Sequence, residues 1–353
     1  MALCDALNQD ILAPNLNTST KCAILSGILG SSYNAQDQSQ DQTFYDSYLR
    51  YYSDQCRIAL HTKGLDRIIA THADVLNIII KVKDPDMPRE VMISSLRTRC
   101  LATQQTEGSE KLLSGAVDLA ARLWLMIDIG LLPQGFTPGQ RPLLWETGLL
   151  KDRLENRFGS QRYNSMMILR VKLDRTFTAR NLERIAGLQI VWTDNIADHL
   201  RLTVDDTRIE IYHHASFLEH QRSNSVFPEG FIEETIYTLS LLFPKYDKKS
   251  RNWFKAQQIR FGLDKKACCC GHLTTEERQV ERFVYWHDRL GILKQVFDEA
   301  EPATLSQWWH DKRRKVQWYT FWVAFTVVLL TIFFGIVQCI EGGFQVYKAY
   351  NPS

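Results

Sequence analysis

The feature that constrains this chain most is a run of 25 residues, Val316 to Ile340, without one charged side chain. At about 1.5 Å per residue, a helix of this length reaches roughly 37 Å, which exceeds the hydrocarbon core of about 30 Å. A buried helix of a water-soluble domain needs fewer apolar residues and tolerates charges. The run therefore predicts one C-terminal transmembrane helix, and we expect residues 316–340 to contact the lipid bilayer.

Basic and aromatic residues flank this run. Four basic residues precede it, whereas Glu341 and a single Lys348 follow it. Because basic residues concentrate on the cytoplasmic side, we expect a single-pass protein with its N-terminal bulk in the cytosol and a short tail, 341–353, across the membrane. The endoplasmic reticulum is the membrane expected first. The residues expected at the membrane interface are Lys312, Arg313, Arg314, Lys315, Trp318, Tyr319 and Trp322.

The remaining sequence fits a folded, cytosolic part. A hydrophobic fraction of 45% in 353 residues is enough for a buried core, and a net charge of +2 creates no strong overall field for anionic partners. The first twelve residues lack a basic segment and a continuous apolar segment, so we expect no cleaved signal peptide. The eight scattered cysteines favour a reducing compartment.

A second apolar stretch, Leu112 to Leu132, contains Asp118, Arg122 and Asp128. Charges at mid-bilayer depth are expensive, so this stretch predicts a core helix rather than a membrane span. Asp118 and Arg122 stand four residues apart, which predicts an ion pair on one helix face.

Composition and hydrophobic period divide the chain. We expect an N-terminal segment, 1–43, with a polar linker at 30–43, a helical domain over 44–131, and a second helical domain over 142–300 with a small β-hairpin unit. A loop rich in Gly and Pro separates the two domains. Helices are predicted at 64–80, 88–103, 109–129, 145–158, 179–186, 214–222, 229–243, 247–258 and 275–299.

Between Leu188 and Tyr212 the apolar period changes from 3.6 to 2, with a turn at Val204 to Thr207. This pattern predicts two or three short strands. The expected fold is therefore mainly α with a small antiparallel β element (α+β), plus one C-terminal transmembrane helix.

No motif for nucleotide, hydrolase or metalloprotease chemistry is present, so no cofactor and no metal are expected. Histidines cluster nonetheless near the predicted strands, where paired strands would bring His199 close to His213, and Asp198 or Glu219 could join them as a metal ligand. A structural role for the histidines is favoured over a metal site. The weak catalytic candidates are Asp198, His199, His213 and His214.

The run Cys268-Cys269-Cys270 has no second cysteine pair at zinc-binding spacing. It follows Lys265 and Lys266, which is typical of cysteines that are S-acylated near a membrane. An exposed loop that tolerates cysteine is the simpler interpretation, and both stay open.

The order of helix, strand and hairpin over 179–213 suggests a winged-helix module. The position of its second helix carries Asp194 and Asp198 instead of basic side chains, so no nucleic-acid partner is expected.

Several stretches resemble a group of uncharacterised filamentous-fungal proteins with a long soluble region and one C-terminal membrane helix. They are AVDLAARLWLMIDIG, FTARNLERIAGLQIVWTDNIADHLRL, RIEIYHHASFLEH and the basic-flanked C-terminal span. The resemblance covers about residues 100–345. It implies the architecture argued above and, for some members, an accessory role beside secondary-metabolite genes. It supplies no catalytic residues.

The leading hypothesis is a non-enzymatic, membrane-tethered interaction or accessory protein that faces the cytosol and binds a protein partner. The alternative is an enzyme of unrecognised type with its site in the β unit. A third hypothesis is a regulator released from the membrane by cleavage near 300–315.

Overall fold

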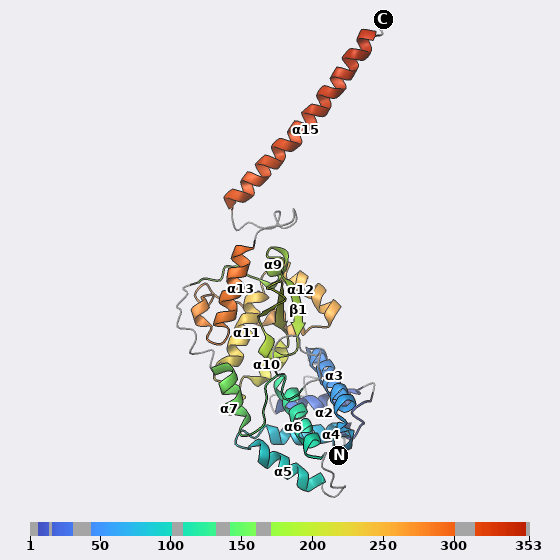
Figure 1. Ribbon diagram of the computed structural model, residues 1–353, viewed down its shortest axis with the longest axis vertical. Coiled ribbons are helices and arrows are strands. Elements are labelled where there is room, and N and C mark those ends of the chain that lie inside the picture. The colour runs from blue at the N-terminus through green and yellow to red at the C-terminus, as the bar shows by residue number, and fades with distance from the viewer. Residues whose placement is uncertain are drawn as a thin grey trace. The chain divides into compact units, whose positions relative to one another are not determined.

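The computed structural model describes residues 6–13, 16–30, 44–100, 109–131, 142–159, 171–300 and 315–350. The chain forms two compact units: the first holds residues 1–183 and 187–299, and the second holds residues 184–186 and 300–353. Figure 1 shows their elements along the chain. The polar linker at 30–43, the Gly/Pro-rich loop and the segment proposed for cleavage fall almost entirely outside the described residues.

The first unit is mainly helical, with a small sheet, as expected. Its α-helices are α2 (Thr18–Leu29), α3 (Asp46–Lys63), α4 (His72–Val82), α5 (Arg89–Cys100), α6 (Ser109–Leu125), α7 (Leu150–Leu154), α9 (Ala179–Arg184), α10 (Ala215–Gln221), α11 (Phe231–Leu242), α12 (Lys248–Phe261) and α13 (His287–Glu299). Short 3-10 or π turns are η3 (Leu65–Arg67), η4 (Glu155–Gly159), η5 (Ile196–Asp198), η6 (Lys265–Cys269) and η7 (Val280–Arg282).

The predicted core helix is confirmed as α6, which packs against α3, α4 and α5. Its buried residues include Leu113, Val117 and Leu123. The expected ion pair within this helix is wrong, because Asp118 Oδ1 lies 2.7 Å from Nη2 of Arg89 on α5. Arg122 instead donates to the carbonyl of Ile129 at 2.9 Å.

One core links the two halves of the chain. Tyr48 on α3 stacks on Phe217 of α10 with ring centroids 5.3 Å apart, and its hydroxyl donates to the carbonyl of Leu123. Both ranges predicted as separate domains therefore contribute to the first compact unit. The boundary between them stays a prediction.

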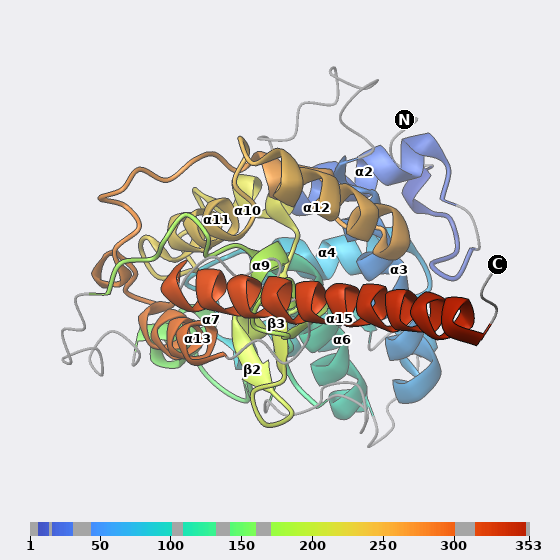
Figure 2. The ribbon, with the colours of Figure 1, turned by 90° about the horizontal axis from the view of Figure 1, so that it is seen from above.

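The sheet has three strands, β1 (Gln189–Thr193), β2 (Arg201–Thr203) and β3 (Arg208–Tyr212), in the order β1-β3-β2. The hairpin of β2 and β3 is antiparallel, as expected. The expectation of antiparallel pairing is wrong for β1, which pairs parallel to the central strand β3. Residues 194–200 lead from the end of β1 across the end of β3 to β2, so they gather polar side chains at that edge. In the view of Figure 2, α10, α11 and α12 lie on the same side of the strands.

The helix predicted at 275–299 begins only at His287. The carboxylate of Glu234 on α11 accepts backbone N–H groups of Val284, Tyr285 and Trp286, each at 2.8 Å. The carboxylate satisfies these N–H groups from outside the helix, so the chain before α13 keeps a non-helical path. Such a long-range contact leaves no local signal in the sequence.

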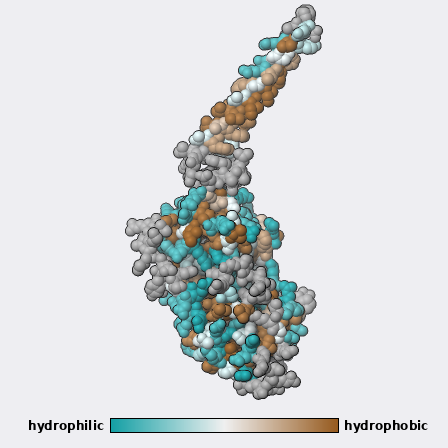
Figure 3. All heavy atoms as spheres, in the orientation of Figure 1, coloured by the Kyte–Doolittle hydropathy of each residue, from teal (hydrophilic) through white to brown (hydrophobic). Residues whose placement is uncertain are grey.

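The second unit holds α15, Lys315–Tyr350, a helix of 36 residues. Within it, Tyr319–Tyr347 forms one helix long and apolar enough to cross a membrane, and the most apolar 18-residue window has none of its residues buried. Figure 3 shows apolar residues covering much of its surface. The helix continues through residues 341–350, which were expected to form part of the tail.

Candidate functional site

The parallel pairing of β1 and β3 creates a polar cluster at their C-terminal ends. Thr193 and Tyr212 are partners in the register, so the residues that follow them emerge at the same edge of the sheet. These residues are Asp194 after β1 and the pair His213 and His214 after β3. The structure thus brings two predicted site residues together with an aspartate that the sequence interpretation did not select as a ligand.

The three side chains converge on one oxygen atom. Oδ1 of Asp194 lies 2.6 Å from Nε2 of His214 and 3.6 Å from Nε2 of His213. The two imidazole rings stack with centroids 4.0 Å apart. Both histidines are buried, whereas half of the Asp194 side chain is exposed. Solvent therefore reaches the cluster from the carboxylate side.

Hydrogen bonds determine how His213 is protonated. Its Nδ1 accepts the backbone N–H of Asp264 at 3.3 Å, so the neutral ring carries its proton on Nε2, which faces Asp194. Burial and the neighbouring His214 lower the pKa of His213 to about 4. Burial raises the pKa of Asp194, but the contacts of its carboxylate with His213 and His214 outweigh burial and hold that pKa well below its usual range. At neutral pH Asp194 is therefore an anion, and Nε2 of His214 lies within hydrogen-bond distance of it.

The same three residues match the donor set of a metal site, because one ligand atom of each lies within 4.8 Å of the others. A metal would need the lone pair of Nε2 on His213, which requires a proton on Nδ1. That nitrogen already faces the N–H of Asp264, and two donors repel each other. The hydrogen-bonded arrangement therefore favours a clamp between the two strands over a metal centre.

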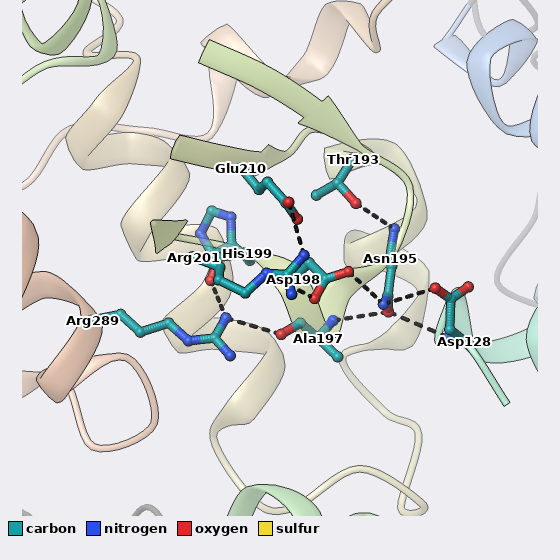
Figure 4. Close-up of polar contacts among 9 residues, drawn as sticks. All are labelled: Asp128, Thr193, Asn195, Ala197, Asp198, His199, Arg201, Glu210 and Arg289. Carbon is teal, nitrogen blue, oxygen red and sulfur yellow. Dashed lines mark hydrogen bonds and ion pairs between the residues drawn. The ribbon is translucent and has the colours of Figure 1, made fainter. Parts of the chain in front are cut away.

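The other two candidates, Asp198 and His199, lie apart from this cluster in a network drawn in Figure 4. Nδ1 of His199 accepts the N–H of Tyr212 at 3.1 Å, and Nε2 lies 2.7 Å from the hydroxyl of Thr238. Burial and the positive charge of Arg289 lower the pKa of His199 to about 3. Both ring nitrogens are engaged, so the geometry supports a neutral core histidine.

Asp198 belongs to a group of buried and half-buried charges that joins four segments of the chain (Figure 4). Asn195 donates from Nδ2 to Asp198 at 2.9 Å and to Asp128, which follows α6, at 3.2 Å. Arg201 lies 3.3 Å from Asp198 and 2.8 Å from Glu210 on β3. Burial and the charge of Asp198 raise the pKa of Asp128 to about 6. A further member is Arg289 of α13, which donates to the carbonyl of Ala197 at 2.9 Å. The sequence interpretation missed most of these residues, since their partners are distant in the chain.

A catalytic role for Asp198, His199, His213 and His214 stays a prediction. Three pockets among the described residues, of about 730, 470 and 690 Å³, are lined by other side chains.

The cysteine run lies in and directly after η6. Cys269 is exposed, whereas Cys268 and Cys270 are partly covered. Burial and the adjacent Cys269 raise the pKa of Cys268 to about 11, and burial followed by Asp264 raises that of Cys270 further. The Sγ atoms of Cys268 and Cys269 are 3.9 Å apart. Of the three, Cys269 is the thiol open to a reagent, and acylation stays a prediction.

Of the residues predicted at the membrane interface, Lys312, Arg313 and Arg314 lie outside the described residues. The others, Lys315, Trp318, Tyr319 and Trp322, occupy the first two turns of α15. The side chain of Tyr319 is exposed.

The chain matches no protein-family model, no curated protein and no solved structure. The resemblance to filamentous-fungal proteins therefore remains an expectation.

Proposed function

We propose that this protein is a single-pass, membrane-anchored interaction protein whose folded first unit faces the cytosol. One observation carries the proposal: among the described residues, the most apolar 18-residue window of α15 has no buried side chain. Leu329, Phe333 and Ile336 are each more than half exposed, in a window with no buried residue. Exposed apolar surface of this extent is unfavourable in water and favourable in a bilayer.

The orientation follows from charge. The basic residues 312–315 precede the helix, and only Lys348 follows it among the basic residues. This asymmetry supports a cytosolic first unit. The proposal also includes a protein partner. Its most specific part is an accessory role linked to secondary metabolism. Both rest on the absence of a catalytic motif in the sequence and on the expectation from resemblance.

Anchorage is tested by alkaline extraction of membranes from expressing cells. The variant Leu329→Lys/Phe333→Lys places two charges at mid-bilayer depth, and each costs about 2.5–3.5 kcal/mol there. The matched variant Gly343→Lys/Tyr347→Lys adds the same charges at the end of the helix, where they reach water. We expect the first variant to leave the membrane fraction and the second to remain. Extraction of the wild-type chain at high pH would contradict anchorage.

Orientation and partner need separate readouts. A glycosylation acceptor added after residue 353 is expected to be modified if the tail enters the endoplasmic reticulum, and an acceptor in the exposed turn at Asp205 is not. A tagged pull-down from detergent-solubilised membranes is expected to retain a defined protein partner. Reversed glycosylation would overturn the orientation, and a pull-down without a partner would overturn the interaction role.

The enzyme alternative rests on the 2.6 Å contact between Asp194 and His214 beside a solvent-exposed carboxylate. The double variant His213→Ala/His214→Ala and a metal assay test it. A phenotype or a metal content that depends on these histidines, in a variant that remains folded, would favour the enzyme.

A further inference from the structure

The segment around α12 carries an unusual local charge. From Lys245 to Lys266 it holds eight lysines and arginines and two aspartates, a local net charge of +6 in a chain whose total is +2. Both aspartates accept hydrogen bonds from backbone N–H groups of the first unit. Asp247 caps α12 by accepting the N–H groups of Lys249 and Ser250, and buried Asp264 accepts those of Ser216 and Lys266. Seven of the eight basic side chains are exposed to solvent.

The helix places this charge on one side. Ser250, Trp253 and Phe254 are buried and form its inner stripe. The opposite side, called here the basic face, consists of Lys248, Arg251, Lys255 and Ile259, which are three or four residues apart and all exposed. Among the described residues, no carboxylate oxygen lies within 4.0 Å of a side-chain nitrogen of Lys245, Lys248, Lys249, Arg251, Lys255, Arg260, Lys265 or Lys266 (the ion pairs found involve other residues).

Apolar side chains stand among these cations. Ile259 is 87% exposed and Phe261 is 43% exposed. The guanidinium of Arg260 lies 5.0 Å from the ring centroid of Phe261. Arg50 of α3 donates to the carbonyl of Phe261 at 3.0 Å and adds another cation at the end of α12. The combination fits a partner that is anionic at its surface and apolar just beneath it.

We propose that the basic face of α12 is a second membrane contact, which binds anionic phospholipid headgroups. Lysine and arginine side chains pair with phosphate and carboxylate headgroups, and Ile259 and Phe261 enter the interfacial layer. A nucleic acid would satisfy the cations and leave Ile259 in water. The inference rests on the proposed anchorage by α15, because only fifteen residues, 300–314, separate Glu299, the last residue of the first unit, from Lys315. This connection keeps the first unit at a high effective concentration near the bilayer.

The test uses the full chain in lipid nanodiscs with a photo-crosslinking amino acid at position 259. The discs contain either phosphatidylcholine alone or roughly one third phosphatidylserine. Position 80 is the control, because Ile80 is also an exposed isoleucine on a helix, 61% exposed, outside the basic face. We expect lipid adducts at position 259 in the anionic discs, about tenfold above those at position 80 or in neutral discs, and their loss in about 0.5 M salt.

Two charge variants complete the experiment. Lys248→Gln/Arg251→Gln/Lys255→Gln is expected to lower the adduct yield at least several-fold. Lys111→Gln/Lys151→Gln/Arg208→Gln removes the same charge from exposed positions elsewhere and is expected to leave the yield unchanged. Circular dichroism verifies that both remain folded. Equal yields in neutral and anionic discs, or at positions 259 and 80, would overturn the proposal.

Two further outcomes are distinguished. If position 259 crosslinks to duplex DNA at concentrations where anionic discs give no lipid adduct, the proposed lipid contact is overturned in favour of a nucleic-acid contact. Resistance of the chain to alkaline extraction reports anchorage by α15, whereas the adduct yield at position 259 reports lipid binding by the basic face. Failure of one proposal is therefore distinguished from failure of the other. If the anchor fails, salt-sensitive sedimentation of the chain with phosphatidylserine vesicles still supports the basic face, and its absence overturns it.

Discussion

Oδ1 of Asp194 lies 2.6 Å from Nε2 of His214, at the point where the parallel strands β1 and β3 end. The contact joins the two strands without a backbone hydrogen bond. It also depends on the charge of the carboxylate, since the pKa of Asp194 is held low although burial raises it.

Asp194→Asn keeps the shape and removes this charge. We expect the free energy of unfolding to fall by about 1–2 kcal/mol, because a charged acceptor is exchanged for a neutral one. Urea denaturation measures the change. Asp205→Asn in the exposed turn between β2 and β3 is the control, with a change below about 0.5 kcal/mol. Equal effects of the two substitutions would contradict the clamp.

Acid is expected to destabilise the first unit through its buried histidines. Burial lowers the pKa of His199 to about 3 and that of His213 to about 4, both below the value of about 6.5 in the unfolded chain. Between these values the unfolded state binds more protons, so stability falls as the pH decreases from about 6.5. For His199 the loss reaches about 2 kcal/mol at pH 5.

Glu234 and Asp128 act in the opposite direction, because burial raises their pKa values to about 7 and about 6. The contribution of His199 is therefore measured by difference. The gap in unfolding free energy between wild type and His199→Gln is expected to narrow between pH 7 and pH 5. A gap that stays constant over this range would show that His199 is not neutral and buried.

The carboxylate of Glu234 holds the segment before α13. Glu234→Gln replaces one carboxylate oxygen by an NH2 group. At least one of the N–H groups of Val284, Tyr285 and Trp286 then faces a donor. We expect a loss of about 1–3 kcal/mol in unfolding free energy. Glu233→Gln, on the same turn of α11 and less buried, is the control. Faster amide exchange of residues 284–286 in the first variant alone would locate the effect.

Prediction from the sequence succeeds where an element depends on residues close together in the chain. Period and composition predicted α6, α11, α12, the hairpin of β2 and β3, and the apolar run within α15, because each depends on local spacing of apolar residues. The start of α9 also has a local cause, because Oγ1 of Thr178 accepts the N–H of Asn181 at 3.3 Å, as a helix N-cap does.

Prediction from the sequence fails where a residue or strand contacts one that is distant in the chain. Alternation shows which side chains of a strand face inward but not which way its neighbour runs, so the parallel pairing of β1 was missed, and Asp194 with it. The interruption of the predicted helix at 64–80 has a local signal that was overlooked. Thr71 and Asp74 form a reciprocal capping box, so α4 begins at His72.

Cys269 is expected to be the modified residue if the cysteine run is acylated. It is the exposed thiol of the three, and the pKa values of its neighbours are raised, which disfavours their reactive thiolates. In membranes from expressing cells, a hydroxylamine-labile acyl group should be lost in Cys269→Ser and retained in Cys268→Ser. Retention in Cys269→Ser would assign the group to another cysteine, and its absence from wild type would exclude acylation.

The backbone at Gly130 has to approach the buried ion pair of Asp118 and Arg89. Gly130 has a φ of +77°, and a Cβ atom there would lie 2.0 Å from Oδ2 of Asp118. Gly130→Ala therefore adds two costs, the positive φ and the displacement of a carboxylate that pairs with Arg89 at 2.7 Å. Gly148→Ala has only the first cost, since its φ is +76° and, apart from its chain neighbours, none of the described residues has an atom within 4 Å of the added Cβ. We expect Gly148→Ala to lose about 1–2 kcal/mol and Gly130→Ala about 1–3 kcal/mol more, measured by urea denaturation. Equal losses would mean that Asp118 moves aside freely, and its pairing with Arg89 would then contribute little to the fold.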